Sequence, residues 1–435
     1  MSEPSILHPV SASSDVDSPF SAFARLLRLR RESAGLSRRR LARLAQLSEA
    51  TIKLLEAAKT RPTRATLLRL LLVEALRLSP ADLPLSHLDL TQSLLHLAQP
   101  VPTHSGYLIA HFDPLPLVED LDRTLAGAGG HIEQSQLYLS SHSALGYLRY
   151  LDRSPDERRR RQSLPIASLA EAIVAHQRDR DLTLVALGPG DGRLEVRLTE
   201  HLHMLRVQRL DLWLLDISSS LLQHAYRQAH DRLGGLTNTT LMAISGSFHE
   251  LPTYTELFTN LSPVGKQRVF VLLGTLTNLD SEARFLKDTL GSVARAGDLL
   301  LLDAPIAMQP PVNVPEPKSA SYHASLSLLT QWLCEPLYRQ LGRSPQCQTR
   351  ITLAREPDDC GQVPGSVASS LVATIESRNP QTVTSVRRFS MLRQRQFPLP
   401  ALRELLCRSG WPPLRILPAH DPSQGQVALL CQRRS

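Results

Sequence analysis

The sequence predicts two kinds of fold in one chain: an all-α domain, then an α/β domain with a doubly wound parallel sheet and an antiparallel C-terminal extension. Three observations predict this arrangement. Residues 21–79 show helical periodicity of apolar side chains throughout. After residue 181, strand-like aliphatic runs alternate with helical segments. The first of those runs ends in a glycine-rich turn, Gly188-Pro-Gly-Asp-Gly192.

Composition and prolines suggest where the domains begin and end. Residues 1–20 lack a basic start followed by an apolar stretch, which predicts a flexible leader rather than a secretory signal. We expect a helical domain over 21–85, a linker with a helical, substrate-side subdomain over 86–180, and the α/β core with lid strands over 181–435. No apolar run reaches the roughly 20 residues of a membrane span. The five cysteines form no Cys-x-x-Cys pair. A cytoplasmic protein with no metal site and no membrane partner is expected.

The net charge of +8 is concentrated in one segment. Residues 21–79 hold fourteen Lys and Arg against four Asp and Glu, so the remaining residues together net −2. A local excess of positive charge favours a polyanionic partner. The alternative is that the segment simply shares the arginine-rich composition of the whole chain.

Helix signals follow one another through this basic segment. Gly35 suits the position after a first helix. Ser37 then caps a helix over 38–45, and Ser48 caps another that runs to about Ala57. Two short helices joined by a tight turn form a helix-turn-helix. The apolar stripe of the first helix begins with Phe23, Leu26, Leu27 and Leu29.

These residues resemble the Cro/C1-type (XRE) family of repressors, in which Leu-Ser-Gln-x-Glu-Leu-Ala is followed by a turn and a second Ser. Gln46 and Ala58 stand where that family usually has glycine, and Arg40 stands where it has Glu. The resemblance implies a homodimer that binds double-stranded operator DNA, with a structural role for Glu56. The alternative is a protein–protein module of the same fold. The DNA-contacting residues that the resemblance implies are Arg38, Arg39, Ser48, Glu49, Thr51 and Lys53.

The α/β part is predicted from five short aliphatic runs, which suit strands buried on both faces. The glycine turn precedes a helical stretch over 194–203, so a ligand can approach the backbone at the carboxyl end of the sheet. Asp216 ends the second run, where it could bind ribose hydroxyls or cap the next helix. The runs are Leu182–Leu187, Arg209–Asp216, Thr240–Ile244, Arg268–Leu273 and Asp298–Asp303.

The remaining segments complete the predicted fold. A helix is expected over 86–98, and the charge run over 157–162 is interpreted as a solvated helix face. Near the C-terminus we expect three antiparallel strands, a helix and a terminal hairpin. Their predicted ranges are Arg350–Ala354, Leu371–Glu376 and Val386–Arg393 for the strands, Pro400–Cys407 for the helix, and Pro413–Leu417 with Gln426–Gln432 for the hairpin.

The glycine loop and the Leu-Leu-Asp216 strand end resemble class I S-adenosylmethionine (SAM) dependent methyltransferases, which have a Rossmann-like fold. The resemblance implies SAM as cofactor, with the loop near its methionine portion, Asp216 on the ribose and Phe248 against adenine. The implied cofactor residues are Gly188, Gly190, Asp191, Gly192, Asp216, Ser247, Phe248 and Gly274.

A narrower resemblance covers the fourth run, Val269-Phe-Val-Leu-Leu-Gly-Thr-Leu-Thr-Asn278, which is similar to the histidine-specific SAM methyltransferases. It implies that Asn278 binds an amino-acid substrate. The chain lacks the second glycine of that family's loop and its upstream Glu-Tyr-Tyr motif. The methyl acceptor is therefore left as a small molecule or a peptide, with an amino-acid nitrogen as one candidate.

Three functions remain open from the sequence. The first is a transcriptional regulator whose SAM domain methylates an acceptor. The second is a repressor whose methyltransferase fold senses SAM without catalysis. The third is a methyltransferase that uses the helical module for dimerisation. No catalytic base is identified, although Tyr254, His249 and Tyr322 are polar residues that could line a pocket.

Overall fold

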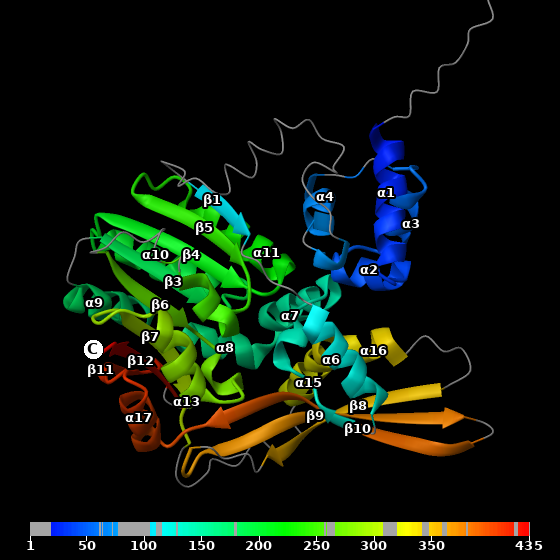
Figure 1. Ribbon diagram of the computed structural model, residues 1–435. Coiled ribbons are helices and arrows are strands. Elements are labelled where there is room, and N and C mark those ends of the chain that lie inside the picture. Colours follow the sequence, from blue (N-terminus) through cyan, green and yellow to red (C-terminus); the bar gives the residue numbers. More distant parts are fainter. Residues whose placement is uncertain are drawn as a thin grey trace, which may run out of the picture. The chain divides into compact units, whose positions relative to one another are not determined.

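The computed structural model divides the chain into two compact units, residues 1–93 and 94–435, each described here by itself (Figure 1). The expected leader up to residue 18 and the expected helix over 86–98 lie outside the described residues. The structure describes residues 19–60, 62, 64–71, 73–76, 105–109, 115–127, 129–177, 181–255, 258, 266–307, 320–341, 348–358, 363–379, 382–421 and 425–434.

The first unit is helical, as predicted. The Ser37 and Ser48 hydroxyls accept hydrogen bonds from the backbone N–H groups of Arg40 and Thr51, which confirms both predicted caps. Leu29 does not belong to the apolar stripe, since it is 61% exposed. It lies two residues, or about 200°, beyond the buried Leu27 on the helix. The elements are α1 (Pro19–Ser33), α2 (Arg38–Leu44), α3 (Glu49–Glu56), α4 (Arg64–Leu71) and the 3₁₀ turn η1 (Glu74–Leu76).

Two turns of this unit have left-handed backbone at non-glycine residues. Gln46 has φ 53° and Ala58 has φ 52°, and both stand where the resembled family has glycine. The next N–H groups close the helix ends: Leu47 donates to the Ala42 carbonyl at 2.7 Å, and Lys59 donates to the Leu54 carbonyl at 2.9 Å. A residue with a Cβ costs about 1 kcal/mol in this conformation.

The second unit is built around an eight-stranded sheet. Its spatial order is β1-β5-β4-β3-β6-β7-β12-β11, and its pairings are parallel except where β12 lies between β7 and β11. The five predicted strands and the terminal hairpin are confirmed to within two residues. β1, which pairs with β5, was not predicted. The strands are β1 (Ser105–Ile109), β3 (Asp181–Leu187), β4 (Arg209–Asp216), β5 (Thr239–Ser245), β6 (Gln267–Leu272), β7 (Leu299–Pro305), β11 (Pro413–Pro418) and β12 (Gln426–Gln432).

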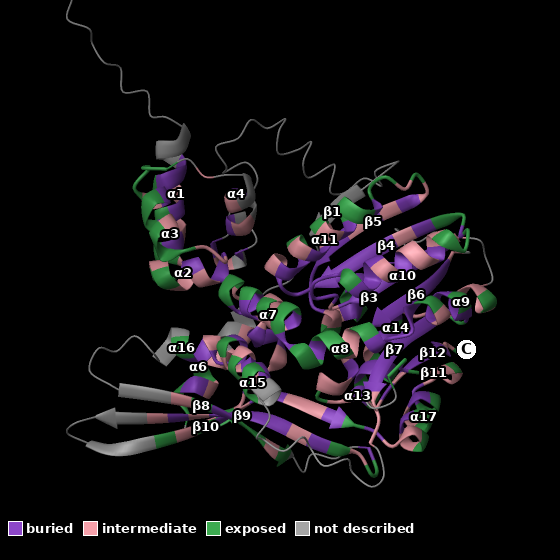
Figure 2. Ribbon diagram, turned by 180° about the vertical axis from the view of Figure 1, so that it is seen from behind, coloured by how far each residue is buried: buried purple, intermediate pink, exposed green. Residues whose placement is uncertain are grey.

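Helices cover both faces of this sheet, which makes it doubly wound, and the central strands are buried throughout (Figure 2). β3 shows the alternation: Leu184 and Ala186 face one apolar core, whereas Val185 and Leu187 face the other. The first core is completed by α9 (Ile166–His176), α10 (Arg193–Met204) and α11 (Ser219–Leu233). The second is completed by η4 (Phe248–Tyr254), the π-helical turn η6 (Phe285–Thr289), α14 (Leu290–Val293) and α17 (Leu399–Arg408). The short helix α13 (Glu282–Arg284) directly precedes η6.

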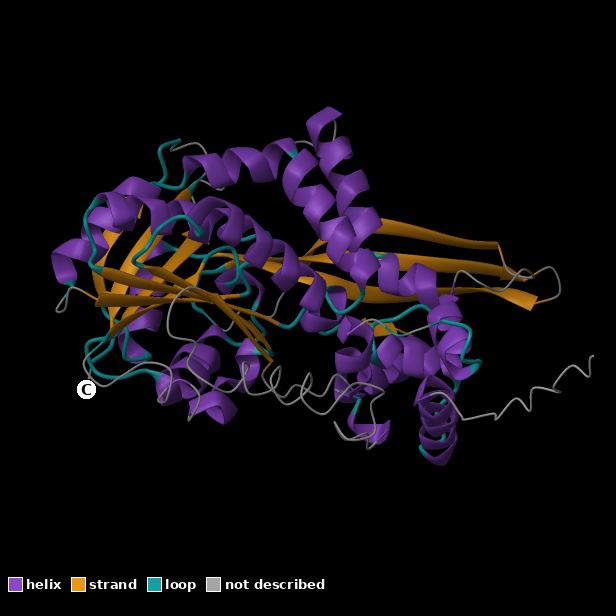
Figure 3. Cartoon of the chain, turned by 90° about the horizontal axis from the view of Figure 1, so that it is seen from above, coloured by secondary structure: helices purple, strands orange, loops and turns teal. Residues whose placement is uncertain are grey.

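A second, four-stranded sheet has the order β2-β10-β9-β8, and its long antiparallel strands extend beyond the helices (Figure 3). The three predicted C-terminal strands are confirmed and are longer than predicted. The strands are β2 (Gly129–His131), β8 (Gln348–Asp358), β9 (Val367–Asn379) and β10 (Thr382–Gln396). The remaining helices are α6 (Leu115–Ala126), η3 (Gln134–Leu137), α7 (Ser141–Arg153), α8 (Pro155–Ser163), η5 (Leu276–Asn278), α15 (Ala320–Leu333) and α16 (Glu335–Leu341). Among the described residues, no helix is both long and apolar enough to cross a bilayer.

Candidate cofactor pocket and candidate DNA-binding helix

The glycine loop joins β3 to α10 through three left-handed residues, Gly188, Gly190 and Gly192, with φ of 68°, 61° and 74°. Gly192 serves packing, because a Cβ there would come within 2.9 Å of the Ala225 Cβ on α11. Gly188 and Gly190 border a cavity instead. A Cβ on Gly190 would lie 3.1 Å from Tyr147 Cε1, so the loop leaves its backbone bare on the cavity side.

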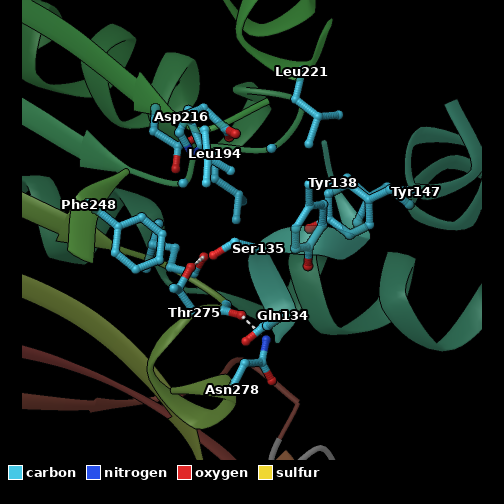
Figure 4. A pocket seen from close by; sticks show the side chains of 18 of the residues that line it. Gln134, Ser135, Tyr138, Tyr147, Leu194, Asp216, Leu221, Phe248, Thr275 and Asn278 are labelled. Carbon is cyan, nitrogen blue, oxygen red and sulfur yellow. Dashed lines mark hydrogen bonds between the residues drawn. The ribbon is translucent and has the colours of Figure 1, made fainter. Parts of the chain in front are cut away.

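A cavity lies at the carboxyl ends of β3, β4 and β6 (Figure 4). Side chains from η3, α7 and α8 form its opposite wall. Of the predicted cofactor and substrate residues, six line this pocket: Gly188, Gly190, Asp216, Phe248, Gly274 and Asn278. The other three, Asp191, Gly192 and Ser247, do not line it.

Asp216 at the end of β4 both contacts the start of the next helix and lines the pocket, so the structure is compatible with both roles that the sequence left open. One of its oxygens accepts a hydrogen bond of 2.8 Å from the Ser218 N–H, at the start of α11. The side chain also lines the pocket and is 5% exposed. Burial raises the pKa of Asp216 to about 7, although backbone hydrogen bonds from Ser218 and Gly190 oppose this shift.

Asp191 turns away from the cavity to an arginine. Arg161 on α8 donates two hydrogen bonds to its carboxylate, of 2.7 and 2.5 Å. Burial alone would raise the pKa of Asp191, but the hydrogen bonds and charge of Arg161 hold it below its usual value. Asp191 also accepts from the Arg193 N–H at the start of α10. It therefore orients the glycine loop from behind.

The charge run over 157–162 is only partly a solvated face, so this interpretation was wrong for two of its arginines. Arg160 donates to Glu157 one turn earlier and, at 2.7 Å, to Asp303 in β7. Asp303 is 2% exposed and also accepts from the Gly274 N–H at 2.5 Å. Burial opposes the charge of Arg160, but Glu157 and Asp303 raise its pKa. Arg160 and Arg161 therefore attach α8 to the functional edge of the sheet.

Glu195 was missed by the sequence interpretation. It lies in the first turn of α10, lines the pocket and is 3% exposed. Its Oε2 has no hydrogen-bond partner among the described residues. Burial raises the pKa of Glu195 to about 8. A glutamate three residues after a glycine turn also suits an ordinary helix start, so no local signal distinguishes it.

An aromatic wall faces the glycine loop and was also not predicted. The rings of Tyr138 and Tyr147 meet edge to face with centroids 5.2 Å apart, and both line the pocket (Figure 4). Trp332 of α15 packs behind them, 4.6 Å from Tyr147. Burial raises the pKa of both tyrosines, so their hydroxyls stay neutral at physiological pH.

The polar residues that the sequence suggested for binding the methyl acceptor do not all line the pocket. Asn278 lines the pocket and donates from Nδ2 to the Gly274 carbonyl at 3.2 Å. His249 lines it too, and burial lowers the pKa of its imidazole. A neutral imidazole at this place can accept a proton. Tyr254 is buried against Glu250 and does not line the pocket. The side chain of Tyr322 lies outside the described residues.

In the helical unit, Glu56 has the structural role that was expected. Its carboxylate is bridged by Arg31 at 2.5 Å and by Arg38 at 2.6 Å, and the Glu56 side chain is 2% exposed. Arg31 also donates to the Leu36 carbonyl at 2.9 Å, so it joins α1, α2 and α3. Arg38, predicted to contact DNA, is committed through its Nε to this network.

The other predicted DNA contacts lie at the N-cap and along α3, and on α2. Glu49, Lys53 and Arg39 are exposed, and Thr51 is half-buried. The Ser48 hydroxyl caps α3 and lies 2.7 Å from the Thr51 hydroxyl. A helix with an exposed, capped N-terminal turn is the part of a helix-turn-helix that can enter a major groove.

Comparison with known proteins separates the two units. Residues 22–85 match the family model of a helix-turn-helix domain, so this segment is such a domain. No curated protein matches the chain. A SAM-dependent methyltransferase from Clostridium acetobutylicum is 12% identical over 64% of this chain and 92% of its own, with a TM-score of 0.33.

Two further similar structures are also methyltransferases. The Burkholderia thailandensis 1,6-didemethyltoxoflavin-N1-methyltransferase is 12% identical over 68% of this chain and 91% of its own, with a TM-score of 0.33. The magnesium protoporphyrin IX methyltransferase of Synechocystis is 14% identical over 73% and 94%, with a TM-score of 0.30. Because these TM-scores are low, the fold class is assigned from the strand order and strand directions of the sheet.

The sheet has the strand order of a class I methyltransferase fold. Counted in chain order from β3, and without β1, the seven strands lie in the order 3-2-1-4-5-7-6, with the seventh antiparallel. The predicted fold class is therefore confirmed: a helix-turn-helix domain is followed by a Rossmann-like α/β domain with an antiparallel extension.

Proposed function

We propose that the chain is a DNA-binding transcriptional regulator whose second unit binds SAM and methylates a small molecule or a peptide. The observation that carries the SAM part is the joint placement of the glycine loop and Asp216 on one cavity, at the carboxyl edge of a sheet of this order. Glycine backbone and a strand-end carboxylate are what an adenosine-bearing ligand without a pyrophosphate requires there.

The residues present fit such a cofactor. The bare backbone of Gly188 and Gly190 leaves room that a Cβ would fill, and Asp216 has an oxygen for ribose hydroxyls. The Phe248 ring, beside the Gly188 backbone, offers a flat apolar surface for adenine. The cofactor would supply an electrophilic methyl group on a sulfonium. The protein would orient an acceptor through Asn278, exclude water with its aromatic wall, and take up a proton at His249.

The DNA part of the proposal rests on the helix-turn-helix match and on charge. The unit presents Lys53 on the exposed face of α3 and Arg39 on the neighbouring α2, within the segment that carries the whole basic excess of the chain. We further propose that it acts as a homodimer on a palindromic operator in the cytoplasm.

Calorimetry with SAM on the full chain tests the cofactor part. Gly190→Arg should abolish measurable binding, because the new side chain meets Tyr147 and enters the cavity. Gly235→Arg is the matched control, since a Cβ at Gly235 meets nothing within 4 Å. Asp216→Asn keeps the shape of the site, and we expect about tenfold weaker binding because its amide loses one acceptor. Absence of binding to the unaltered protein would refute a SAM site.

Binding of duplex DNA at several salt concentrations tests the other part. Lys53→Ala should weaken binding about tenfold and reduce the salt slope by about one. Lys287→Ala removes the same charge from an exposed position in the second unit and should leave both unchanged. Binding without salt dependence, or no binding, contradicts the proposal. Comparing operator affinity with and without SAM then separates a sensor from two independent activities.

A further inference from the structure

Glu195 is a buried acid that the preceding proposal leaves without a role. Glutamates at the third position of a helix commonly accept from the N–H of the capping residue. Here the cap is Gly192, and its N–H donates to the Pro189 carbonyl at 3.0 Å instead. Glu195 Oε2 is left in the pocket wall without a hydrogen-bond donor in the described part of the chain. A helix start alone therefore does not explain this carboxyl group.

The neighbouring positive charges are already neutralised. Arg161 is held by Asp191, and Arg160 is held by Glu157 and Asp303. These two arginines and His249 are the basic side chains among the described residues that line the pocket, and burial lowers the pKa of His249, which favours its neutral form. The pocket's remaining acids, Glu195 and Asp216, are thus buried in its wall without a cationic partner among the described residues. Buried carboxylates are costly unless paired, so this arrangement is suited to a ligand that brings positive charge.

We propose that Glu195 is the counter-ion for a cationic group on the methionine portion of the ligand, either its sulfonium or its ammonium. This inference rests on the proposed SAM site and names the residue that would recognise the cofactor's charge. Glu195 lies in the first turn of α10, directly after the glycine loop, and lines the same cavity as Gly190 and Leu194.

The protonation of Glu195 in the free protein makes its role as a counter-ion measurable. Burial raises the pKa of Glu195 to about 8, so at pH 7 most of the free protein carries a protonated carboxyl group. A cation beside it favours the carboxylate, and binding then releases close to one proton from this group. Asp216 can release a proton as well, so the informative quantity is the difference between the unaltered protein and a Glu195 variant.

The experiment is calorimetry of the full chain with SAM at pH 7, in two buffers of different ionisation enthalpy. Glu195→Gln keeps the size of the side chain and removes its charge. It should bind SAM at least tenfold more weakly and release close to one proton fewer. Glu200→Gln is the control: Glu200 lies on the same helix, away from the pocket, paired with Arg232. Its affinity and proton release should match the unaltered protein.

Two more ligands locate the charge. S-Adenosylhomocysteine keeps the ammonium but not the sulfonium, and 5′-methylthioadenosine has neither cation. If Glu195→Gln weakens only SAM, the partner is the sulfonium; if it also weakens S-adenosylhomocysteine, the partner is the ammonium. Equal weakening of 5′-methylthioadenosine, or unchanged binding of SAM with unchanged proton release, overturns the role of Glu195 alone. No binding of SAM to the unaltered protein overturns the cofactor proposal and this one together.

Discussion

Each unit of the chain buries a glutamate, and the two glutamates differ in what surrounds their carboxyl groups. Glu56 in the helix-turn-helix is bridged by Arg31 and Arg38. Glu195 in the α/β unit has an oxygen with no partner among the described residues. A buried carboxylate with two guanidinium partners is complete and holds helices together. A buried carboxyl group without a cationic partner holds no helices together and destabilises the fold when it ionises.

The largest expected effect is the loss of stability on replacing Glu56, the glutamate that two arginines bridge. Glu56→Ala removes the carboxylate that joins Arg31 to Arg38 and leaves Arg31 with the exposed Glu32 as its remaining carboxylate partner, and we expect the helical unit to lose about 3 kcal/mol of unfolding free energy. Amide hydrogen exchange over residues 19–60 of the full chain measures this loss, while the second unit serves as the internal reference. Glu49→Ala, at the exposed start of the same helix, should cost less than about 1 kcal/mol. Equal effects of the two substitutions would contradict the distinction.

For Glu195, which has an unpartnered oxygen among the described residues, we expect removal of the carboxyl group to stabilise the folded protein at neutral and higher pH. The pKa of Glu195 is raised in the folded protein, so between about pH 4.5 and 8 the folded state binds more protons than the unfolded state. Its contribution to stability is full at low pH and is lost as the pH rises through that window. Glu195→Gln has no such loss.

The stability of Glu195→Gln relative to the unaltered protein should therefore increase from pH 5 to pH 8, on the order of 3 kcal/mol. Denaturant unfolding followed by tryptophan fluorescence measures it, because Trp213, Trp332 and Trp411 all lie in this unit. Asp216 titrates in both proteins and cancels from the difference. A pH-independent difference between the two proteins would mean that Glu195 stays ionised in the free fold.

The smallest expected effect concerns strain rather than charge. Ala58→Gly, at φ 52°, should stabilise the helical unit by about 1 kcal/mol, because glycine adopts left-handed backbone without the Cβ clash. Hydrogen exchange of the first unit again gives the value. Gly35→Ala makes the reverse change at φ 66°, in open space, and should destabilise by a similar amount. Destabilisation by Ala58→Gly would place the strain elsewhere.

The elements could be predicted from sequence because their signals are local. Ser37 and Ser48 cap helices through N–H groups three residues away, and the strands of the core are continuous aliphatic runs. The glycine loop and Asp216 were found for the same reason: each is placed by the strand that precedes it.

What the sequence could not reveal depends on distant partners. Arg160 and Arg161 belong to a run that has no local reason to be buried, and their counter-ions Asp303 and Asp191 lie 143 and 30 residues away. Glu195 differs from an ordinary first-turn glutamate only because the pocket wall closes over it. β1 is short and becomes a strand through its pairing with β5.

The pairing of β1 with β5 has a consequence for co-translational folding on the ribosome. Ser105 pairs with Leu241, and Gly129 of β2 pairs with Arg388, so the early segments wait for about 140 and 260 further residues. At roughly 5–20 residues per second, the delay is on the order of ten seconds or more. The helix-turn-helix needs no such wait, because its contacts lie within its own segment. The nascent chain can therefore carry a folded helix-turn-helix domain while the wall of its pocket still lacks the sheet against which Tyr147 packs and the Asp191 carboxylate that pairs with Arg161.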